Sequence, residues 1–162
     1  MWGTSQGEAM LDTHAATDHS DVCLSYLFTA RDFRGTLGNN ITQSRPVNLT
    51  DVSFSGIAYR GGVCRNHFLT LKDHGKLEGI SLNTGFVTFA GNSLSSEPLL
   101  TFAHEVGHNL GAEHDGDGNH CDPNHYMMAA VAQTYSRDHS KIFSYCSKNY
   151  FRTELRSMVQ VQ

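Results

Sequence analysis

The segment HEVGHNLGAEHD, residues 104–115, constrains this 162-residue chain more than any other part of its sequence. His104 and His108 are four residues apart, so on a helix they project from one face, one turn apart. If that helix continued, His114 would lie about 240° around the axis and about 9 Å further along it. Gly111 resolves the mismatch, because a glycine can adopt the positive φ that ends a helix and turns the chain back. The spacing therefore predicts that the three rings meet at one point.

Three neutral imidazoles fit three corners of a tetrahedral zinc site and leave the fourth for water. Zinc lowers the pKa of such a water to about 7, which makes hydroxide available near neutral pH. Glu105 is adjacent to His104, so we expect its carboxylate to reach this water as a general base rather than to bind the ion. A bare HExxH pair could also be a satisfied surface or core pair, but HExxHxxGxxH fixes five positions, each with a mechanical reason. The pattern predicts Zn²⁺ as cofactor and hydrolysis of an amide bond.

The segment SSEPLLTFAHEVGHNLG predicts a helix that carries this motif, with a serine cap, Pro98 in the first turn and an end at Gly111. Apolar residues at helical spacing predict its buried stripe. They are Leu99, Phe102, Ala103, Val106 and Leu110.

The rest of the sequence contains signals for strands, for a long loop and for a second helix. Alternation predicts a strand at 22–29, glycines bound a short extended piece at 34–38, and polar residues with a proline predict a long loop over 39–55. Residues 79–89 resemble strand material around an Asn-Thr-Gly turn. A second helix is predicted over 147–158, with an inner side formed by Phe151, Leu155 and Met158.

Length and charge limit the classes of protein. A chain of this size, with 39% hydrophobic residues, supports one core, and we expect residues 22–162 to form a single domain behind a polar, aperiodic tail at 1–21. The net charge of -4 and the lack of a basic run argue against binding to nucleic acid or an anionic membrane. No apolar run approaches the roughly 20 residues that span a bilayer. We expect a monomer whose partners are proteins or peptides.

Cysteines and glycosylation signals indicate an extracellular or cell-surface location. The four cysteines lack CxxC spacing, so structural disulfides are the better interpretation. The two sequons fall in the polar loop and predict glycosylation of Asn40 and Asn48. The start of the chain lacks the layout of a signal peptide.

The extended motif resembles that of the metzincin zinc peptidases, and Asp115 directly after the third histidine resembles the adamalysin, or ADAM, branch. The downstream HYMMAA is similar to the Met-turn of these enzymes. The resemblance implies that Met128 forms an apolar floor beneath the zinc, and that Gly111 and Asp115 support the site. Another metzincin branch remains an alternative, which Asp115 disfavours.

The similarity covers roughly residues 22–158 and is closest to the sheddases of that family, the tumour-necrosis-factor-converting and Kuzbanian-type enzymes; it rests on YLFTARDFRGTLG, GGVC, SLNTG and FSYCSK. It implies a disulfide between Cys121 and Cys146, whereas Cys23 and Cys64 could be free or paired with each other. It implies substrates that are extended polypeptides, including ectodomains of membrane proteins. The implied substrate-binding residues are Gly35, Thr36, Leu37 and Gly38 in an edge strand above the cleft, and Ala130, Val131 and Ala132 in a specificity pocket.

The fold expected from the resemblance is an α+β zincin with a mixed twisted sheet, an active-site helix, a Met-turn and a C-terminal helix. The family begins with a strand, helix, strand, helix unit, and nothing before Val22 resembles it, so we expect these elements to be missing. Residues 39–56 form an insertion relative to the family. The competing hypothesis is a non-catalytic zinc-binding or decoy module with the same fold.

Overall fold

The computed structural model describes residues 6–30, 33–35, 52–54, 56–65, 68–71, 77–89, 97–130 and 141–159. Within these ranges the helices are α1 (Gln6–Ala15), α2 (Glu97–Asn109) and α3 (Tyr145–Val159). The strands are β1 (Ser25–Thr29), β2 (Phe33–Gly35), β3 (Val52–Phe54), β4 (Gly56–Ala58), β5 (Phe68–Leu71), β6 (Leu77–Ile80) and β7 (Thr84–Thr88).

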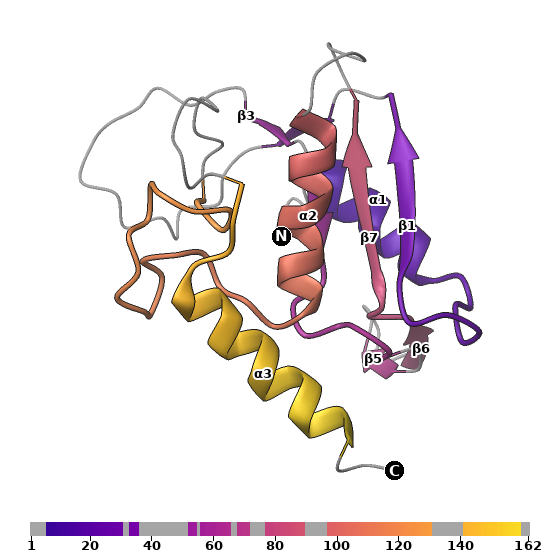
Figure 1. Ribbon diagram of the computed structural model, residues 1–162. Helices are drawn as coiled ribbons and strands as arrows, with labels where there is room; N and C mark the ends of the chain where they lie inside the picture. The colour runs from indigo at the N-terminus through magenta and orange to yellow at the C-terminus, as the bar shows by residue number, and fades with distance from the viewer. Residues whose placement is uncertain are drawn as a thin grey trace.

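The central sheet has the strand order β1-β7-β4. β1 runs parallel to β7, and β4 runs antiparallel to it at the edge. Two antiparallel ladders, β2 with β3 and β5 with β6, complete the pairing of the described strands. In the view of Figure 1, α2 lies in front of the sheet and α1 behind it. The mixed sheet between helices confirms the expected α+β class.

The face of the sheet toward α1 carries one apolar row across three strands. Leu27 of β1, Phe86 of β7 and Ile57 of β4 are in register, and Leu11 of α1 packs against this group. Phe86 is fully buried and Leu11 is 4% exposed. Period-two alternation explains the row, because successive side chains of a strand point to opposite faces.

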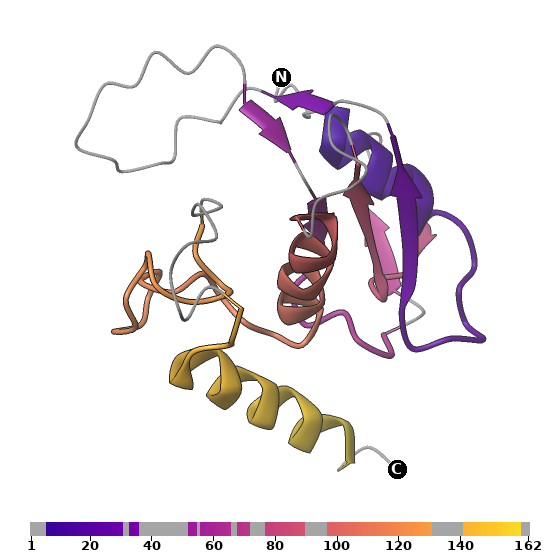
Figure 2. The ribbon, with the colours of Figure 1, turned by 45° about the horizontal axis from the view of Figure 1, so that its top comes forward.

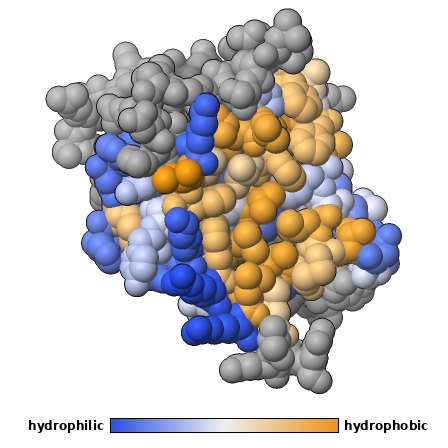
Figure 3. Space-filling view, viewed as in Figure 1, coloured by the Kyte–Doolittle hydropathy of each residue, from blue (hydrophilic) through white to orange (hydrophobic). Residues whose placement is uncertain are grey.

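The opposite face of the sheet packs against α2 through aromatic rings. Tyr26 and Phe28 of β1 lie 4.9 and 5.5 Å, between ring centroids, from Phe102 of α2. Gly85 of β7 leaves room for Tyr26, because a Cβ atom there would come within 2.6 Å of the ring. Figure 3 shows apolar surface where the carboxyl ends of β1 and β7 lie beside α2. The exposed Phe28 and Phe89 stack there with centroids 5.7 Å apart.

The prediction that residues 1–21 form a polar, aperiodic tail is wrong for residues 6–15, which form a helix. Residues 6–15 form α1, and residues 16–22 are tied to the sheet because the amide of Asn83 donates to the carbonyls of His19 and Val22. The domain therefore begins no later than Gln6, not at Val22. Among the described side chains of α1, the buried apolar ones are Leu11 and Ala15, which is too short a stripe to identify the helix without its partner surface.

Several predicted strands and loops have different bounds in the structure. The strand expected at 22–29 begins at Ser25, and Val22 is 41% exposed. Thr84 and Gly85, expected in a turn, lie within β7, and the loop expected over 39–55 contains β3. Ser95 and Ser96 lie outside the described residues.

Both predicted helices exist, but their predicted inner sides are partly wrong. Leu99 of α2 is 68% exposed and Leu155 of α3 is 47% exposed. The most buried positions of α2 are instead Glu105, Gly107 and Asn109. The polar Glu105 and Asn109, one turn apart on the helix, are therefore more buried than the predicted apolar residues.

α3 lies near the carboxyl end of α2 (Figures 1 and 2). Glu154 of α3 forms an ion pair with Arg65 at 2.7 Å, and its side chain lies over Gly111. Disulfides join Cys121 to Cys146, as expected, and Cys23 to Cys64, the pairing that the sequence left open. None of the described helices combines the length and apolar character needed to cross a bilayer.

We predict that Leu11→Ala lowers the free energy of unfolding by about 3 kcal/mol, because it leaves a cavity against Phe86. Urea denaturation measures the loss. Thr13→Ala, at an exposed position of the same helix, is the control and should change stability by less than about 1 kcal/mol. Equal losses for the two variants would show that α1 does not belong to the core.

Candidate metal centre

The carboxyl end of α2 turns back through hydrogen bonds that satisfy its last carbonyls. The Ala112 N–H donates to the carbonyl of Gly107 at 3.0 Å, and the Gly111 N–H donates to that of His108 at 2.8 Å. This is the pattern of a Schellman motif, and Gly111 has the φ of +92° that it requires. The prediction that the helix ends at a left-handed glycine is confirmed.

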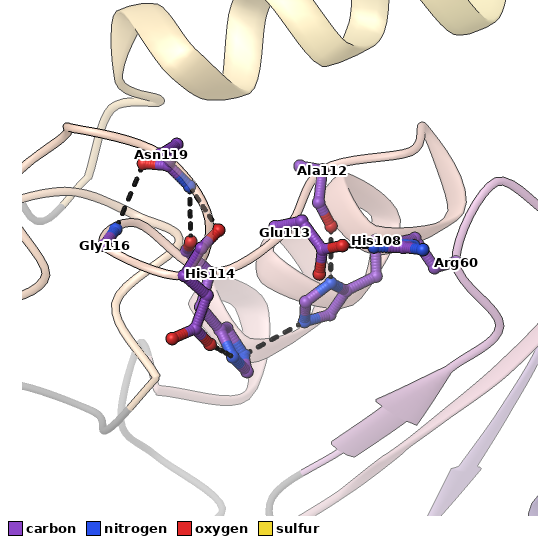
Figure 4. Close-up of polar contacts among 8 residues, drawn as sticks. Arg60, His108, Ala112, Glu113, His114, Gly116 and Asn119 are labelled. Atoms are coloured by element: carbon purple, nitrogen blue, oxygen red, sulfur yellow. Dashed lines mark hydrogen bonds and ion pairs between the residues drawn. The ribbon is translucent and has the colours of Figure 1, made fainter. Parts of the chain in front are cut away.

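The turn brings the three histidine rings together. The ring centroids of His104, His108 and His114 are 4.8 to 5.3 Å apart, and one nitrogen of each ring lies within 4.8 Å of the others. The Nε2 atoms of His108 and His114 are 3.2 Å apart, and Figure 4 shows these two rings pointing toward one another. Nitrogens at about 2.1 Å from a tetrahedral zinc ion would be about 3.4 Å apart, so the separation suits a shared ion.

The other nitrogen of each ring faces an oxygen acceptor. Nδ1 of His104 lies 2.7 Å from the carbonyl of Met127, and Nδ1 of His108 lies 2.9 Å from that of Ala112. Nδ1 of His114 lies 3.5 Å from the Asp117 carboxylate. These contacts favour the tautomer with the proton on Nδ1, which leaves the lone pair of each Nε2 free for a metal ion.

Burial keeps the three rings neutral. Desolvation lowers the pKa of His104 to about 4 and that of His108 to about 3, and it also lowers the pKa of His114. A neutral imidazole is the form that binds a metal. The donor atoms, their tautomers and their protonation state therefore all fit a zinc ion.

Met128 packs directly beneath α2. It is fully buried, and a Cβ atom at Gly107 would lie 2.5 Å from its Sδ and 3.0 Å from a ring carbon of Phe143. A glycine inside a helix is unfavourable by about 1 kcal/mol relative to alanine, and this close approach explains why one occurs here. The structure thus places Met128 against the helix between the first two histidines, as an apolar floor requires.

Asp115 anchors the third histidine to α3. Its carboxylate, 1% exposed, accepts a hydrogen bond at 2.6 Å from Ser144, whose hydroxyl oxygen also accepts from the Ser147 N–H as the N-cap of α3. The Asp115 N–H donates to the carbonyl of Met128. The Cys121–Cys146 disulfide crosslinks the same region. Because both sulfurs are in this bond, they are not available as thiolates to bind a metal ion together with the nearby His120.

Glu105 lies between α2 and the edge strand β4. Its side chain is 6% exposed, and a Cβ atom at Gly56 of β4 would come within 2.8 Å of its Cγ and 3.0 Å of its Oε1. The absence of a side chain at Gly56 therefore admits the carboxyl group. Burial raises the pKa of Glu105 to about 8, close to the pH at which a general base works.

The predicted substrate-binding residues are only partly described. Gly35 lies in β2 and pairs with β3, so it does not form the sheet edge beside α2; β4 occupies that position. Ala130 is exposed after the Met-turn. Thr36, Leu37, Gly38, Val131 and Ala132 lie outside the described residues, as do Asn40 and Asn48.

Sequence analysis missed several residues that shape the site. The carbonyls of Met127 and Ala112 orient rings, but a backbone acceptor leaves no mark in the sequence. The sequence could have predicted the contact of Asp117 with the ring of His114, because the two residues are three positions apart. Gly56 and Gly107 make room for Glu105 and Met128, which only the packing reveals.

A histidine pair on a helix, a glycine turn and a third histidine whose ring meets the first two form a cluster that suits a metallopeptidase. Comparison with known proteins gives the family. Residues 3–115 match the profile of the reprolysin-like M12B metallopeptidases, and the chain belongs to that family.

Curated relatives agree with the resemblance to the ADAM branch. The human Disintegrin and metalloproteinase domain-containing protein 10 is 33% identical over 157 residues, which cover 86% of this chain and 19% of the relative. The Caenorhabditis elegans homolog of that protein is 34% identical over 145 residues, covering 85% and 14%. The chain thus spans a fifth or less of the length of these relatives.

We predict that Glu105 makes the chelator-treated protein less stable as pH rises. A carboxyl whose pKa is raised on folding, here from 4.5 to about 8, keeps its proton in the native state at pH values where the unfolded chain has lost it. Stability is therefore lost between about pH 4.5 and 8. In Glu105→Gln this loss is absent, so the unfolding free energy of the variant should exceed that of the parent by a margin that grows with pH. Urea denaturation across this range measures the margin, and a constant margin would contradict the prediction.

We predict that Gly107→Ala lowers the free energy of unfolding by about 1 kcal/mol, because the clash with Met128 exceeds the gain in helix propensity. A double-mutant cycle with Met128→Ala isolates the contact. The double variant should be more stable than the sum of the single effects predicts. Additive effects would show that the two side chains do not compete for space.

Proposed function

We propose that this chain is a zinc-dependent metalloendopeptidase domain that hydrolyses peptide bonds in extended polypeptides. The observation that carries the proposal is the convergence of three neutral imidazoles whose Nδ1 atoms all face oxygen acceptors. Membership of the reprolysin-like M12B family supports it.

His104, His108 and His114 would hold the ion, and Met128 would support it from below without binding it. Zinc at this position would supply Lewis acidity and an activated water near neutral pH. The two outer contacts from backbone carbonyls and the one from Asp117 would keep the rings in their metal-binding orientation.

Glu105 would act as the general base. Its carboxylate takes a proton from the attacking water as the new C–O bond forms, and it returns a proton to the amine nitrogen as the C–N bond breaks. A nearly buried carboxylate with a raised pKa suits both transfers, because it accepts and releases a proton near neutral pH.

The edge strand β4 is a suitable surface for the substrate backbone. It pairs with β7 on one side, and among the described strands nothing pairs with its other side. An extended peptide could add to such an edge through main-chain hydrogen bonds. The Glu105 carboxyl group lies directly against Gly56 of this strand, which would bring a bound peptide close to the base.

The setting of the enzyme is also a proposal. Two disulfides favour an oxidising compartment, hence an extracellular or cell-surface location. The resemblance to the sheddases suggests the ectodomains of membrane proteins as substrates.

We predict that Glu105→Ala retains zinc and lowers the rate of peptide cleavage about a thousandfold, because only the base is lost. Metal content of the purified protein and cleavage of a quenched fluorescent peptide, with and without chelator, measure the two effects. His120→Ala, at an exposed position, is the control and should keep full activity. A parent chain that binds zinc but shows no chelator-sensitive cleavage would instead support a non-catalytic zinc-binding module.

A further inference from the structure

We infer that Asn109 is a positioning residue that sets the register of the histidine-bearing helix on the sheet, and so determines how well the three rings fit one metal ion. The inference rests on the proposed zinc site and adds a residue to it. Asn109 follows His108 directly and is fully buried at the end of α2. Neither the zinc-binding pattern nor the catalytic chemistry described above uses it.

One amide group connects α2 to every strand of the central sheet. Nδ2 of Asn109 donates to the carbonyl of Thr84 in β7 at 3.2 Å and to that of Tyr59, directly after β4, at 2.9 Å. Its Oδ1 accepts a hydrogen bond from the hydroxyl of Tyr26 in β1. Both amide hydrogens and the oxygen are therefore occupied, by groups in β7, in β1 and directly after β4.

The backbone beside Asn109 is held as well. The carbonyl of Asn109 accepts from the N–H of Val63 at 3.1 Å, and that of His108 accepts from the N–H of Gly61 at 2.9 Å. The loop that supplies both donors is fixed by the Cys23–Cys64 disulfide. The last turn of α2 thus has polar contacts to the sheet and to this loop.

Hydrogen bonds fix a register more sharply than apolar packing does. Apolar side chains tolerate a small rotation or slide of a helix, whereas a buried amide that moves loses partners and leaves unsatisfied groups behind. On the side of α2 toward the sheet, the apolar Phe102 is only partly buried, and the two buried side chains, those of Glu105 and Asn109, are polar. A rotation of α2 would move His104 and His108 together, away from His114 on the turn.

The test measures zinc affinity apart from stability and from activity. Asn109→Asp keeps the size of the side chain and the acceptor for Tyr26, but it replaces the donor to two carbonyls. Asn83→Asp is the matched control, because Asn83 is also fully buried and its Nδ2 also donates to two backbone carbonyls, those of His19 and Val22. The hydrogen bonds of its side-chain amide run to the loop before β1, and none of them reaches α2.

Zinc affinity is measured by competition with a chromophoric chelator, at a temperature where circular dichroism shows that each variant is folded. We expect Asn109→Asp to lose about tenfold or more in zinc affinity, the size of effect known for residues that orient metal ligands. Asn83→Asp should lose stability in urea yet bind zinc as the parent does. Folded Asn109→Asp that binds zinc as tightly as Asn83→Asp would overturn the inference.

If Asn109→Asp does not fold, Tyr26→Phe tests whether the hydrogen bonds of Asn109 affect zinc affinity. This variant removes only the hydroxyl that donates to Asn109 and leaves the ring against Phe102. We expect a smaller but measurable loss of zinc affinity, and no loss would overturn the inference. A parent chain that binds zinc but cleaves no peptide would refute the proposed function alone, whereas a parent that binds no zinc would refute both.

Discussion

The reversal of the chain at Gly111 is the constraint on which the rest of the site depends. Two backbone hydrogen bonds close the end of α2 there, and the same turn supplies the carbonyl of Ala112 that orients His108. His114 then returns to the rings that the helix presents. A residue with a Cβ atom would resist the φ of +92°, so the helix end, the orientation of His108 and the position of His114 all depend on one glycine.

The site is held from two sides by different kinds of contact. On the side of α3, buried polar groups and the Cys121–Cys146 disulfide fix the segment that carries His114, through the carboxylate of Asp115 and the cap at Ser144. On the side of the sheet, Gly56 leaves room for Glu105, and on the opposite side of α2 Gly107 allows Met128 to approach the helix. The histidines are therefore placed by buried polar groups and by small residues more than by a large apolar core.

This arrangement explains where the sequence pattern failed. Leu99 has the right helical spacing but is 68% exposed, whereas Phe102 of the same predicted stripe packs against the rings of β1. Residues 6–15 have too few apolar positions to mark a helix, yet Leu11 finds the row formed by Leu27, Phe86 and Ile57. In both cases the position of a neighbouring element, rather than local periodicity, decided burial.

The sequence by itself determined the local pattern: the two histidines one turn apart, the glutamate beside the first of them and the helix end at Gly111. These follow from spacing and backbone preference, which act over a few residues. Only the tertiary structure decided the pairing of Cys23 with Cys64, the role of β4 as the sheet edge beside α2, and the contacts of Asn109 with three strands. Those features join residues up to 83 positions apart in the chain, and no local pattern specifies which distant backbone groups will meet a buried side chain.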